Sequence, residues 1–321
     1  MKKIRVFING FGRIGRVSAK ILSQEPDVEI VGINDLYDKE QMLHLFRYDT
    51  IYKEFDRDIL KNTLFFKEQN PKNLKIEELE IDILLQCSGV YLSKKSNEIF
   101  LEKGVKRVIV SAPCKDNTKT FIMGINEHLY DGETIISASS CSANAIVTAL
   151  APLQKRYGIK SAQFSMIHSY TADQNLLDLK HSSNDLRRAR SASMNVLPLQ
   201  SSASKAVENI LRELKGKTTA ISVRVPLASC TFYDLTLFLE KDSSYKSLYE
   251  IFKNAKSNYL DITDKPCVSS DFIKNTHSCV IDMAYTTQIK KNLVKIGAWQ
   301  DNEYAYAARL SELSLLIAKS L

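Results

Sequence analysis

Cys141 is the residue whose neighbours best suit it for covalent chemistry. It follows Ser139 and Ser140, and an apolar run typical of a buried helix begins at Ala145. A cysteine at a helix N-terminus meets unpaired N–H groups and the positive end of the helix dipole, which both stabilise a thiolate. Because a thiolate attacks carbonyl carbon, the segment predicts a nucleophilic site at Cys141.

A glycine motif near the start of the chain indicates what this nucleophile works with. The apolar run 4–9 leads directly into Gly10, Gly12 and Gly15, in the spacing GxGxxG. A helix-like segment and a second apolar strand follow, and Asp35 ends the unit 25 positions after Gly10. Strand, glycine turn, helix, strand and acidic residue in this order predict a dinucleotide-binding fold.

The residues of this motif have separable tasks. Gly10 allows the tight turn, Gly12 lets the backbone approach a pyrophosphate, and Gly15 lets helix and strand pack closely. The pyrophosphate would sit at the helix N-terminus. Asp35 would accept hydrogen bonds from the adenosine ribose and repel a 2′-phosphate, so the motif favours NAD over NADP.

The first half of the chain has the pattern of a doubly wound α/β sheet. Its short apolar strands end in small and polar residues, among them Ser88 and Ser111, and such residues at the carboxyl ends of parallel strands are where this fold binds its ligand. The expected elements are the strands 4–9, 28–33, 81–86, 105–111 and 134–138 and the helix 16–22.

The second half has longer strands that alternate apolar and polar residues, which predicts a mixed or antiparallel sheet with one covered face. These strands are 161–167, 220–225, 231–239, 280–287 and 294–299. The polar, arginine-rich stretch 173–199 is too irregular for one element, and a long loop of this kind is usually functional. A closing helix places Tyr306, Leu310, Leu313 and Ile317 on one face.

The expected architecture is therefore α/β with two domains. Residues 1–140 would form a Rossmann domain with a parallel sheet, completed by a C-terminal helix at 302–321. Residues 141–301 would form an α+β catalytic domain with a mixed or antiparallel sheet. A chain of 321 residues is long enough for two such cores.

Composition excludes several function classes. The net charge of +7 is dispersed among acidic residues, which argues against a primary nucleic-acid partner. Neither an apolar run of 18 residues nor a signal peptide is visible, so we expect a cytoplasmic protein without a membrane partner. The six cysteines are scattered and read as reduced thiols. The five histidines lack metal-binding spacing, so no metal site is expected.

Taken together, the motifs resemble those of phosphorylating glyceraldehyde-3-phosphate dehydrogenases along nearly the whole chain. His168 lies 27 positions after Cys141, which is the spacing of that family. The matching segments are Ile8–Arg16 (INGFGRIGR), Ser140-Cys141 with Asn144, Ile167–Thr171 (IHSYT), Asp185–Arg190 (DLRRAR), Arg224–Pro226 (RVP) and Asp301–Glu303 (DNE).

The resemblance implies a reaction and a role for each site residue. Cys141 would attack the aldehyde to give a thiohemiacetal, and His168 would act as the base. Hydride transfer to NAD would leave a thioester, which inorganic phosphate cleaves. Cofactor binding would fall to Gly10, Phe11, Gly12, Arg13, Ile14, Asp35, Ser88, Ser111 and Asn302. Thr171 and Arg224 would bind the substrate phosphate, and Ser140, Ser142, Arg188, Ser201 and Ser202 would line the phosphate-binding region.

Three departures from the family pattern carry their own expectations. Ser142-Ala143 stands where the family has Thr-Thr, which keeps one hydroxyl beside the nucleophile. Ser202 replaces a glycine, and a serine there is strained if the position has a positive φ. Lys180 replaces a proline of NAD-type members and could partly offset Asp35, so NADP remains possible.

The favoured hypothesis is an enzyme of glycolysis or gluconeogenesis whose partners are a triose phosphate and inorganic phosphate. Two alternatives stay open at this point: an erythrose-4-phosphate dehydrogenase, and a catalytically weakened paralogue with a binding role. The resemblance also implies a homotetramer in which the arginine-rich loop reaches toward a neighbouring subunit.

Overall fold

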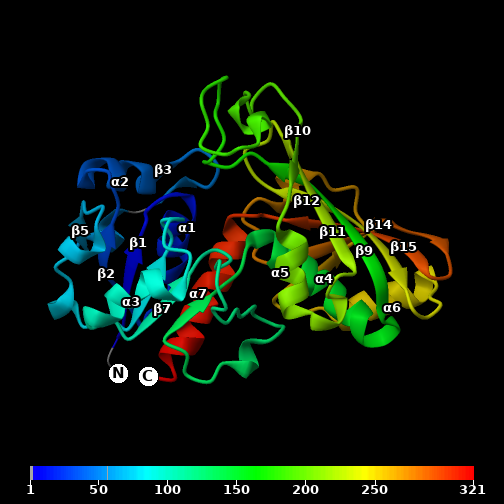
Figure 1. The fold of residues 1–321 in the computed structure, drawn as a ribbon, viewed down its shortest axis with the longest axis horizontal. Coiled ribbons are helices and arrows are strands. Elements are labelled where there is room, and N and C mark those ends of the chain that lie inside the picture. Colours follow the sequence, from blue (N-terminus) through cyan, green and yellow to red (C-terminus); the bar gives the residue numbers. More distant parts are fainter. Residues whose placement is uncertain (1–2, 56) are drawn as a thin grey trace. The chain divides into compact units, whose positions relative to one another are not determined.

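The chain divides into two units, shown in the computed structural model of Figure 1, which describes residues 3–55 and 57–321. The first unit comprises residues 1–140 together with 306–321, and the second comprises residues 141–305. The last sixteen residues therefore pack with the N-terminal part of the chain and not with the residues that immediately precede them.

A six-stranded parallel sheet forms the centre of the first unit. Its strand order is β5-β2-β1-β6-β7-β8, and every neighbouring pair is parallel. This order reverses between β1 and β6, as in the Rossmann fold, and it confirms the predicted doubly wound sheet. The strands are β1 (Ile4–Asn9), β2 (Val28–Asn34), β5 (Leu64–Phe66), β6 (Ile83–Gln86), β7 (Arg107–Val110) and β8 (Ile135–Ser137).

The helices of this unit include two that the sequence pattern predicts and two that it does not. The glycine motif opens directly into α1, and the closing segment forms α7, whose Leu310, Leu313 and Ile317 are buried as expected. The helices are α1 (Arg13–Leu22), α2 (Lys39–Arg47), α3 (Lys94–Glu102) and α7 (Tyr304–Ala318). A small antiparallel pair, β3 (Tyr48–Asp49) and β4 (Lys53–Glu54), follows α2.

A seven-stranded mixed sheet organises the second unit. The order is β10-β11-β9-β12-β15-β14-β13; the pairs β9–β11 and β13–β14 are parallel and the other neighbouring pairs are antiparallel. The mixed sheet expected from the alternating pattern is thus confirmed. The strands are β9 (Ile159–Ser169), β10 (Leu197–Gln200), β11 (Thr218–Val225), β12 (Thr231–Leu239), β13 (Leu260–Thr263), β14 (Cys279–Lys290) and β15 (Leu293–Gln300).

Three helices pack on this sheet: α4 (Cys141–Tyr157), α5 (Ala203–Ile210) and α6 (Tyr245–Asn254). Helix α4 is buried along most of its length, which explains why its sequence lacks the polar face of a surface helix. Along β12, burial alternates residue by residue, so one face of the strand packs under the helices.

The arginine-rich stretch is mostly irregular, as predicted, with one short 3₁₀ helix at Leu186–Ala189. Its end differs from the expectation: Leu197–Gln200 pairs antiparallel with β11 and forms the edge strand β10. Other short 3₁₀ helices are Arg57–Leu60, Pro71–Asn73, Glu77–Leu79, Glu127–Leu129, Arg212–Leu214 and Ser269–Phe272.

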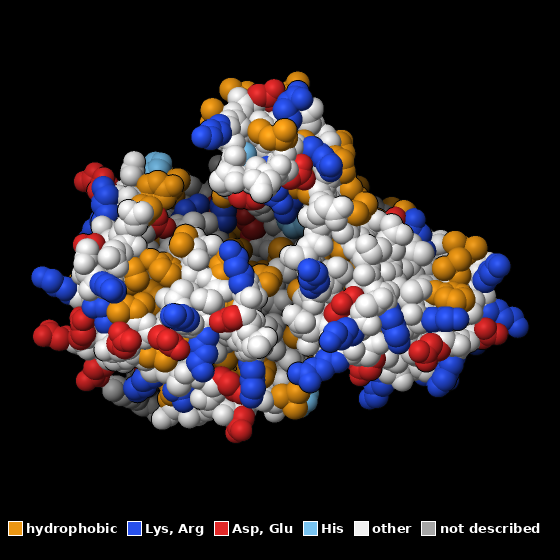
Figure 2. All heavy atoms as spheres, in the orientation of Figure 1, with side chains coloured by type: hydrophobic (Ala, Val, Ile, Leu, Met, Phe, Trp, Pro, Cys, Tyr) orange, Lys and Arg blue, Asp and Glu red, His pale blue; other side chains and the backbone are white. Residues whose placement is uncertain are grey.

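Basic and acidic side chains are interspersed over the face of the molecule seen in Figure 2. Within residues 3–55 and 57–321, no helix combines the length and the apolar character needed to cross a membrane.

Candidate active site

The glycine loop after β1 has the backbone that the motif requires. Gly10 has φ of +98°, a left-handed conformation that other residues rarely adopt, and a Cβ there would collide with the backbone of Cys87 and Ser88. A Cβ at Gly15 would collide with the carbonyl of Gly10. The loop and α1 therefore pack as closely as they do only because both positions are glycine.

Gly12 differs from its two neighbours in the motif. It is the N-cap residue of α1, and nothing lies within 4 Å of the position that its Cβ would occupy. Packing therefore does not explain this glycine, whereas a ligand that must approach the backbone closely does. The helix N-terminus beside an open glycine suits the pyrophosphate of a dinucleotide, so the residues present fit NAD.

Asp35 lies at the carboxyl end of β2 and is held by the loop itself. Its Oδ2 accepts a hydrogen bond from the Phe11 N–H and its Oδ1 accepts one from the Leu36 N–H at 2.6 Å. The structure therefore brings together Asp35 and the glycine loop, as expected. The Arg13 guanidinium points elsewhere: it pairs with Asp49 at 2.5 Å.

A buried network of amide side chains underlies this edge of the sheet, and the sequence analysis did not predict it. Asn34 donates to Asn9 Oδ1 at 2.7 Å, and Asn9 donates to Gln86 Oε1 at 3.0 Å. The Ser88 hydroxyl donates to the same Gln86 oxygen at 2.8 Å, and the Ser111 hydroxyl donates to the Gln86 carbonyl at 3.1 Å. Ser88 and Ser111 thus lie at the same edge as the glycine loop. The signal that could have found the network is a polar residue at the last position of β1, β2 and β6.

The second unit brings together Cys141 and His168. Cys141 begins α4 and His168 is the penultimate residue of β9, and their Sγ and Nε2 atoms lie 3.8 Å apart. The other ring nitrogen of His168, Nδ1, lies 2.7 Å from the Ser169 carbonyl oxygen. When Nδ1 donates its proton to that carbonyl, the lone pair of Nε2 faces the sulfur.

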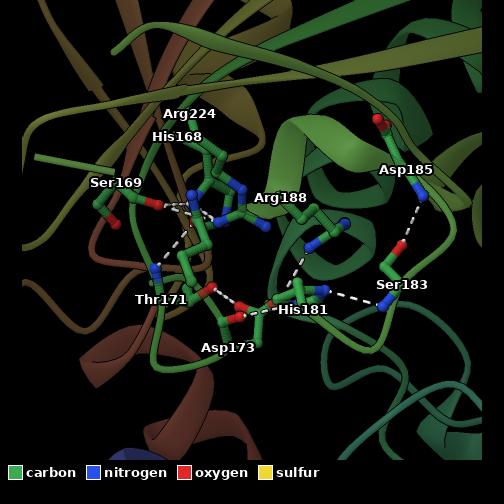
Figure 3. A network of polar contacts seen from close by, with 10 residues as sticks. His168, Ser169, Thr171, Asp173, His181, Ser183, Asp185, Arg188 and Arg224 are labelled. Atoms are coloured by element: carbon green, nitrogen blue, oxygen red, sulfur yellow. Dashed lines mark hydrogen bonds and ion pairs between the residues drawn. The ribbon is translucent and has the colours of Figure 1, made fainter. Parts of the chain in front are cut away.

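Arg224 lies directly beside His168 because β9 and β11 are paired in that register. Its Nη1 is 2.7 Å from His168 Nδ1 and donates to the Ser169 carbonyl at 2.9 Å, as Figure 3 shows. The buried Nε of Arg224 has no hydrogen-bond partner among the described residues. A buried guanidinium with an unused N–H is suited to an anionic ligand.

Burial and Arg224 set the protonation of the pair. Burial raises the pKa of the Cys141 thiol, while the positive charge of Arg224 opposes that rise. Burial also lowers the pKa of His168 to about 3, with a further contribution from Arg224. Both shifts favour the uncharged forms of the thiol and the imidazole, and the shift at Cys141 opposes the effect that the helix N-terminus has on the sulfur.

A second set of polar groups continues from Arg224 into the arginine-rich loop. The Thr171 hydroxyl donates to Asp173 Oδ1, and Arg188 Nη1 lies 2.7 Å from Asp173 Oδ2 (Figure 3). The positive charges of Arg224 and Arg188 and the Thr171 hydrogen bond lower the pKa of Asp173 against the effect of its partial burial. The structure thus joins Thr171 and Arg188 through Asp173, which the sequence analysis did not single out.

Asn302 and Ser142 lie in the buried part of this unit. Asn302 Oδ1 accepts hydrogen bonds from Ser169 Oγ at 3.0 Å and from Thr231 Oγ1 at 3.5 Å. Ser142 Oγ lies 4.0 Å from the sulfur of Cys141. Ser140 directly precedes the nucleophile and ends the N-terminal segment of the first unit.

Ser201 and Ser202 lie at the start of α5, and Ser201 Oγ accepts a hydrogen bond from the Ala203 N–H at 3.2 Å. The condition for strain at Ser202 is not met: its φ is −81°, which any residue adopts without cost. The turn closes as an ordinary helix start, so serine is accommodated there without distortion.

The two other arginines of the arginine-rich stretch bond to residues of the same stretch. Arg187 donates to the Pro198 carbonyl at 2.6 Å, and Arg190 pairs with Asp178 at 3.0 Å. Lys180 is solvent-exposed. In the part of the chain that the structure describes, no group of three or more His, Cys, Asp or Glu side chains is arranged to hold a metal ion.

A Rossmann sheet with an open glycine loop, joined in one chain to a cysteine–histidine pair flanked by arginines, defines an NAD-dependent oxidoreductase. Two family models match the chain: the NAD binding domain of glyceraldehyde 3-phosphate dehydrogenase over residues 4–94, and the C-terminal domain over residues 140–302. The chain belongs to the glyceraldehyde-3-phosphate dehydrogenase family.

Curated relatives match over almost their whole length. Glyceraldehyde-3-phosphate dehydrogenase from Thermotoga maritima is 38% identical, covering 98% of this chain and 99% of its own. Glyceraldehyde-3-phosphate dehydrogenase 2 from Streptomyces avermitilis is 36% identical over 99% of both chains. The protein of the same name from Bacillus subtilis is also 36% identical, over 97% of this chain and 96% of its own.

Proposed function

We propose that this protein oxidises D-glyceraldehyde 3-phosphate with NAD and inorganic phosphate to 1,3-bisphosphoglycerate, as part of glycolysis or gluconeogenesis. The observation that carries the proposal is the distance of 3.8 Å between Cys141 Sγ and His168 Nε2, with Arg224 held against the same imidazole. A nucleophile, a base and an anion-binding guanidinium are what a phosphorylated aldehyde requires.

His168 would take the proton of the Cys141 thiol as the sulfur bonds to the aldehyde carbon and would pass it to the carbonyl oxygen, which forms the thiohemiacetal hydroxyl. It would take the same proton back when the thioester forms. The Ser169 carbonyl oxygen, 2.7 Å from Nδ1, would hold the imidazole in the tautomer that this transfer needs by accepting the Nδ1 proton. The resulting thioester on Cys141 would be cleaved by phosphate, which leaves the acyl phosphate and returns the sulfur as a thiolate.

Arg224 and Thr171 would bind the phosphate of the substrate, and Arg188 with the hydroxyls of Ser142 and Ser201 would bind the attacking phosphate. A substrate phosphate on Arg224 would neutralise the charge that helps to hold His168 unprotonated. The base would therefore gain proton affinity when the substrate is bound, which couples binding to chemistry.

NAD, when bound, supplies the hydride acceptor. The backbone of Gly10–Ile14 and the Asp35 carboxylate would hold its adenosine and pyrophosphate parts, with Ser88 and Ser111 along the same sheet edge. Asn302 would orient the carboxamide of the nicotinamide. The first unit would thus be the NAD-binding domain, completed by the C-terminal helix, and the second unit would be the catalytic domain.

We further infer a cytoplasmic homotetramer. Six large apolar side chains of the arginine-rich loop are 64–80% exposed, which is more apolar surface than one irregular loop usually leaves in water. They are Leu176, Leu177, Leu179, Leu186, Met194 and Val196. The family resemblance supports a neighbouring subunit as their partner.

The test is NADH formation by the purified protein with glyceraldehyde 3-phosphate and NAD, with and without phosphate. Cys141→Ala should abolish turnover, while the matched control Cys267→Ala, at another partly exposed cysteine, should retain it. A parallel assay with NADP tests the effect of Lys180. Turnover that ignores phosphate, or that prefers erythrose 4-phosphate, would contradict the proposal. Absence of any aldehyde-dependent turnover would favour a binding role.

A further inference from the structure

His181 uses both of its ring nitrogens in the arginine-rich loop, although Lys180 and Ser182 on either side of it are exposed. Its Nδ1 accepts a hydrogen bond from the Ser183 N–H at 2.9 Å, and its Nε2 lies 2.8 Å from the Asp173 carbonyl oxygen. Because a carbonyl oxygen only accepts, Nε2 is the donor in the second bond. The two bonds together require a neutral imidazole that carries its proton on Nε2.

With these bonds His181 joins two arms of the chain. The first arm follows β9 and contains Thr171 and Asp173, and the second leads through Ser183 to the 3₁₀ helix Leu186–Ala189. Both arms are irregular where His181 connects them. Side-chain hydrogen bonds therefore contribute to the placement that backbone bonds alone would give in a sheet or a long helix.

The contacts of His181 belong to a closed ring of hydrogen bonds, here called the loop ring. Beyond the Ser183 N–H, which donates to His181, Ser183 Oγ accepts from the Asp185 N–H at 3.1 Å (Figure 3). The Asp185 carbonyl accepts from the Arg188 N–H at 3.0 Å. Arg188 Nη1 donates to Asp173 Oδ2 at 2.7 Å, and the Asp173 carbonyl closes the ring at His181 Nε2. The loop ring thus holds both the backbone and the guanidinium of Arg188.

Asp173 takes part in the loop ring through two different groups. Its carboxylate pairs with Arg188, whereas its backbone carbonyl accepts from His181. A phosphate bound to Arg188 competes with the carboxylate, because both are anions and share one guanidinium. It does not compete with the backbone carbonyl for His181. The His181 bond therefore remains in place when the carboxylate is displaced.

We propose that His181 is a positioning residue that holds Arg188 in place while inorganic phosphate replaces the Asp173 carboxylate on its guanidinium. This role rests on the proposed function of Arg188 in binding the attacking phosphate. His181 itself needs no contact with phosphate. It acts on Arg188 through Ser183 and Asp185 on one side, and through the backbone of Asp173 on the other.

The experiment measures initial rates of NADH formation by the full chain while inorganic phosphate is varied at saturating glyceraldehyde 3-phosphate and NAD. His181→Ala removes both bonds of the imidazole. We expect KM for phosphate to rise roughly tenfold, while kcat and KM for NAD stay within about twofold. The matched control is Asn184→Ala in the same turn. Asn184 is exposed and has no side-chain hydrogen bond among the described residues, so its removal should leave all three constants unchanged.

Further variants separate positioning from loosened packing. His181→Gln keeps a neutral donor near the position of Nε2, and His181→Asn keeps an acceptor near the position of Nδ1. Each retains one of the two bonds, so its KM for phosphate should lie between the values of the unchanged protein and of His181→Ala. Arg188→Ala removes the group through which His181 acts, so adding His181→Ala to it should raise KM no further.

Hydrogen exchange of peptides from residues 173–190, read by mass spectrometry, tests the loop ring without turnover. His181→Ala frees the N–H groups of Ser183, Asp185 and Arg188, so their exchange should accelerate at least about fivefold, whereas Asn184→Ala should leave it unchanged.

The two measurements distinguish failure of this role from failure of the proposed function. Turnover that ignores phosphate in the unchanged protein overturns the proposed function, and the role of His181 with it. Phosphate-dependent turnover whose KM for phosphate is the same in His181→Ala overturns the role of His181 alone. Unchanged exchange in His181→Ala also overturns that role, because the loop ring would then hold without the imidazole.

Discussion

His168 combines two demands at the scale of a single residue: it must be buried beside Cys141, and it must accept a proton during the proposed reaction. Burial and Arg224 hold its pKa near 3, far below that of an exposed imidazole. Both demands are met only if a bound ligand raises the pKa of His168. An anion on Arg224 does so, because it offsets the positive charge that lowers this pKa. The same depressed pKa has a consequence for stability that can be measured without substrate.

We predict that His168→Gln makes the protein less sensitive to acid. Below about pH 6.5 the unfolded chain binds a proton at His168 while the folded chain does not, so stability falls with pH from 6.5 down to about 3. At pH 5 this group alone costs about 2 kcal/mol relative to pH 7. Urea unfolding at both pH values should show a smaller difference in the variant. The exposed His128→Gln control should behave as the unchanged protein, and an equal loss in all three proteins would contradict the depressed pKa.

The carboxylate of Asp173 lies in a site proposed to bind phosphate, so it competes with phosphate for the same hydrogen-bond donors. It occupies the Thr171 hydroxyl and Arg188 and lies in the field of Arg224. Asp173→Asn keeps the shape and the acceptor oxygen but removes the charge that repels a phosphate. We expect KM for glyceraldehyde 3-phosphate to fall about threefold to tenfold, since one charge interaction near a protein surface is worth about 1 kcal/mol. A KM that rises would show instead that the carboxylate is needed to hold Arg188 in place.

At the scale of elements, the glycine loop between β1 and α1 separates folding from binding. Gly12→Ala places a methyl group in open space and should leave the melting temperature nearly unchanged while weakening NAD binding at least tenfold, because the methyl group blocks the pyrophosphate. Gly10→Ala combines a φ of +98° with a collision against Ser88 and should destabilise the first unit by about 1–3 kcal/mol or more. Calorimetry and NAD titration of both variants test this contrast. If Gly12→Ala were the less stable of the two variants, the space around the Cβ position of Gly12 would not be open.

The elements predicted well from sequence are those in which one local pattern decides. β1 (Ile4–Asn9) and β12 (Thr231–Leu239) have the predicted bounds, one as a continuous apolar run and the other as a strict alternation. The start of α4 at Cys141 also agrees, since its apolar run is long. The segment Leu197–Gln200 was expected to be part of the loop, because it is short. It forms the edge strand β10 only by pairing with β11, which is distant in the sequence.

The same distinction applies to the candidate site. Cys141, His168 and Arg224 stand in motifs, and their sequence positions suffice to propose their roles. Asp173 was not found, because its significance lies in its contacts with Thr171 and Arg188, which only the folded loop brings together. The burial that raises the pKa of the Cys141 thiol was also not predicted, because a helix N-terminus is visible in a sequence and the depth of burial is not.

At the scale of the whole molecule, the proposed homotetramer would cover the exposed apolar side chains of the arginine-rich loop. If a second copy of the chain covers them, light scattering should give four times the chain mass of 36.3 kDa. Leu177→Glu combined with Leu186→Glu would bury two charges in that interface and should reduce the mass to that of dimers or monomers, since each unpaired buried charge costs several kcal/mol. Leu129→Glu, at a similarly exposed leucine of the first unit, is the control and should leave the assembly intact. A tetramer that survives the double substitution would mean that this loop faces solvent and that another surface holds the subunits together.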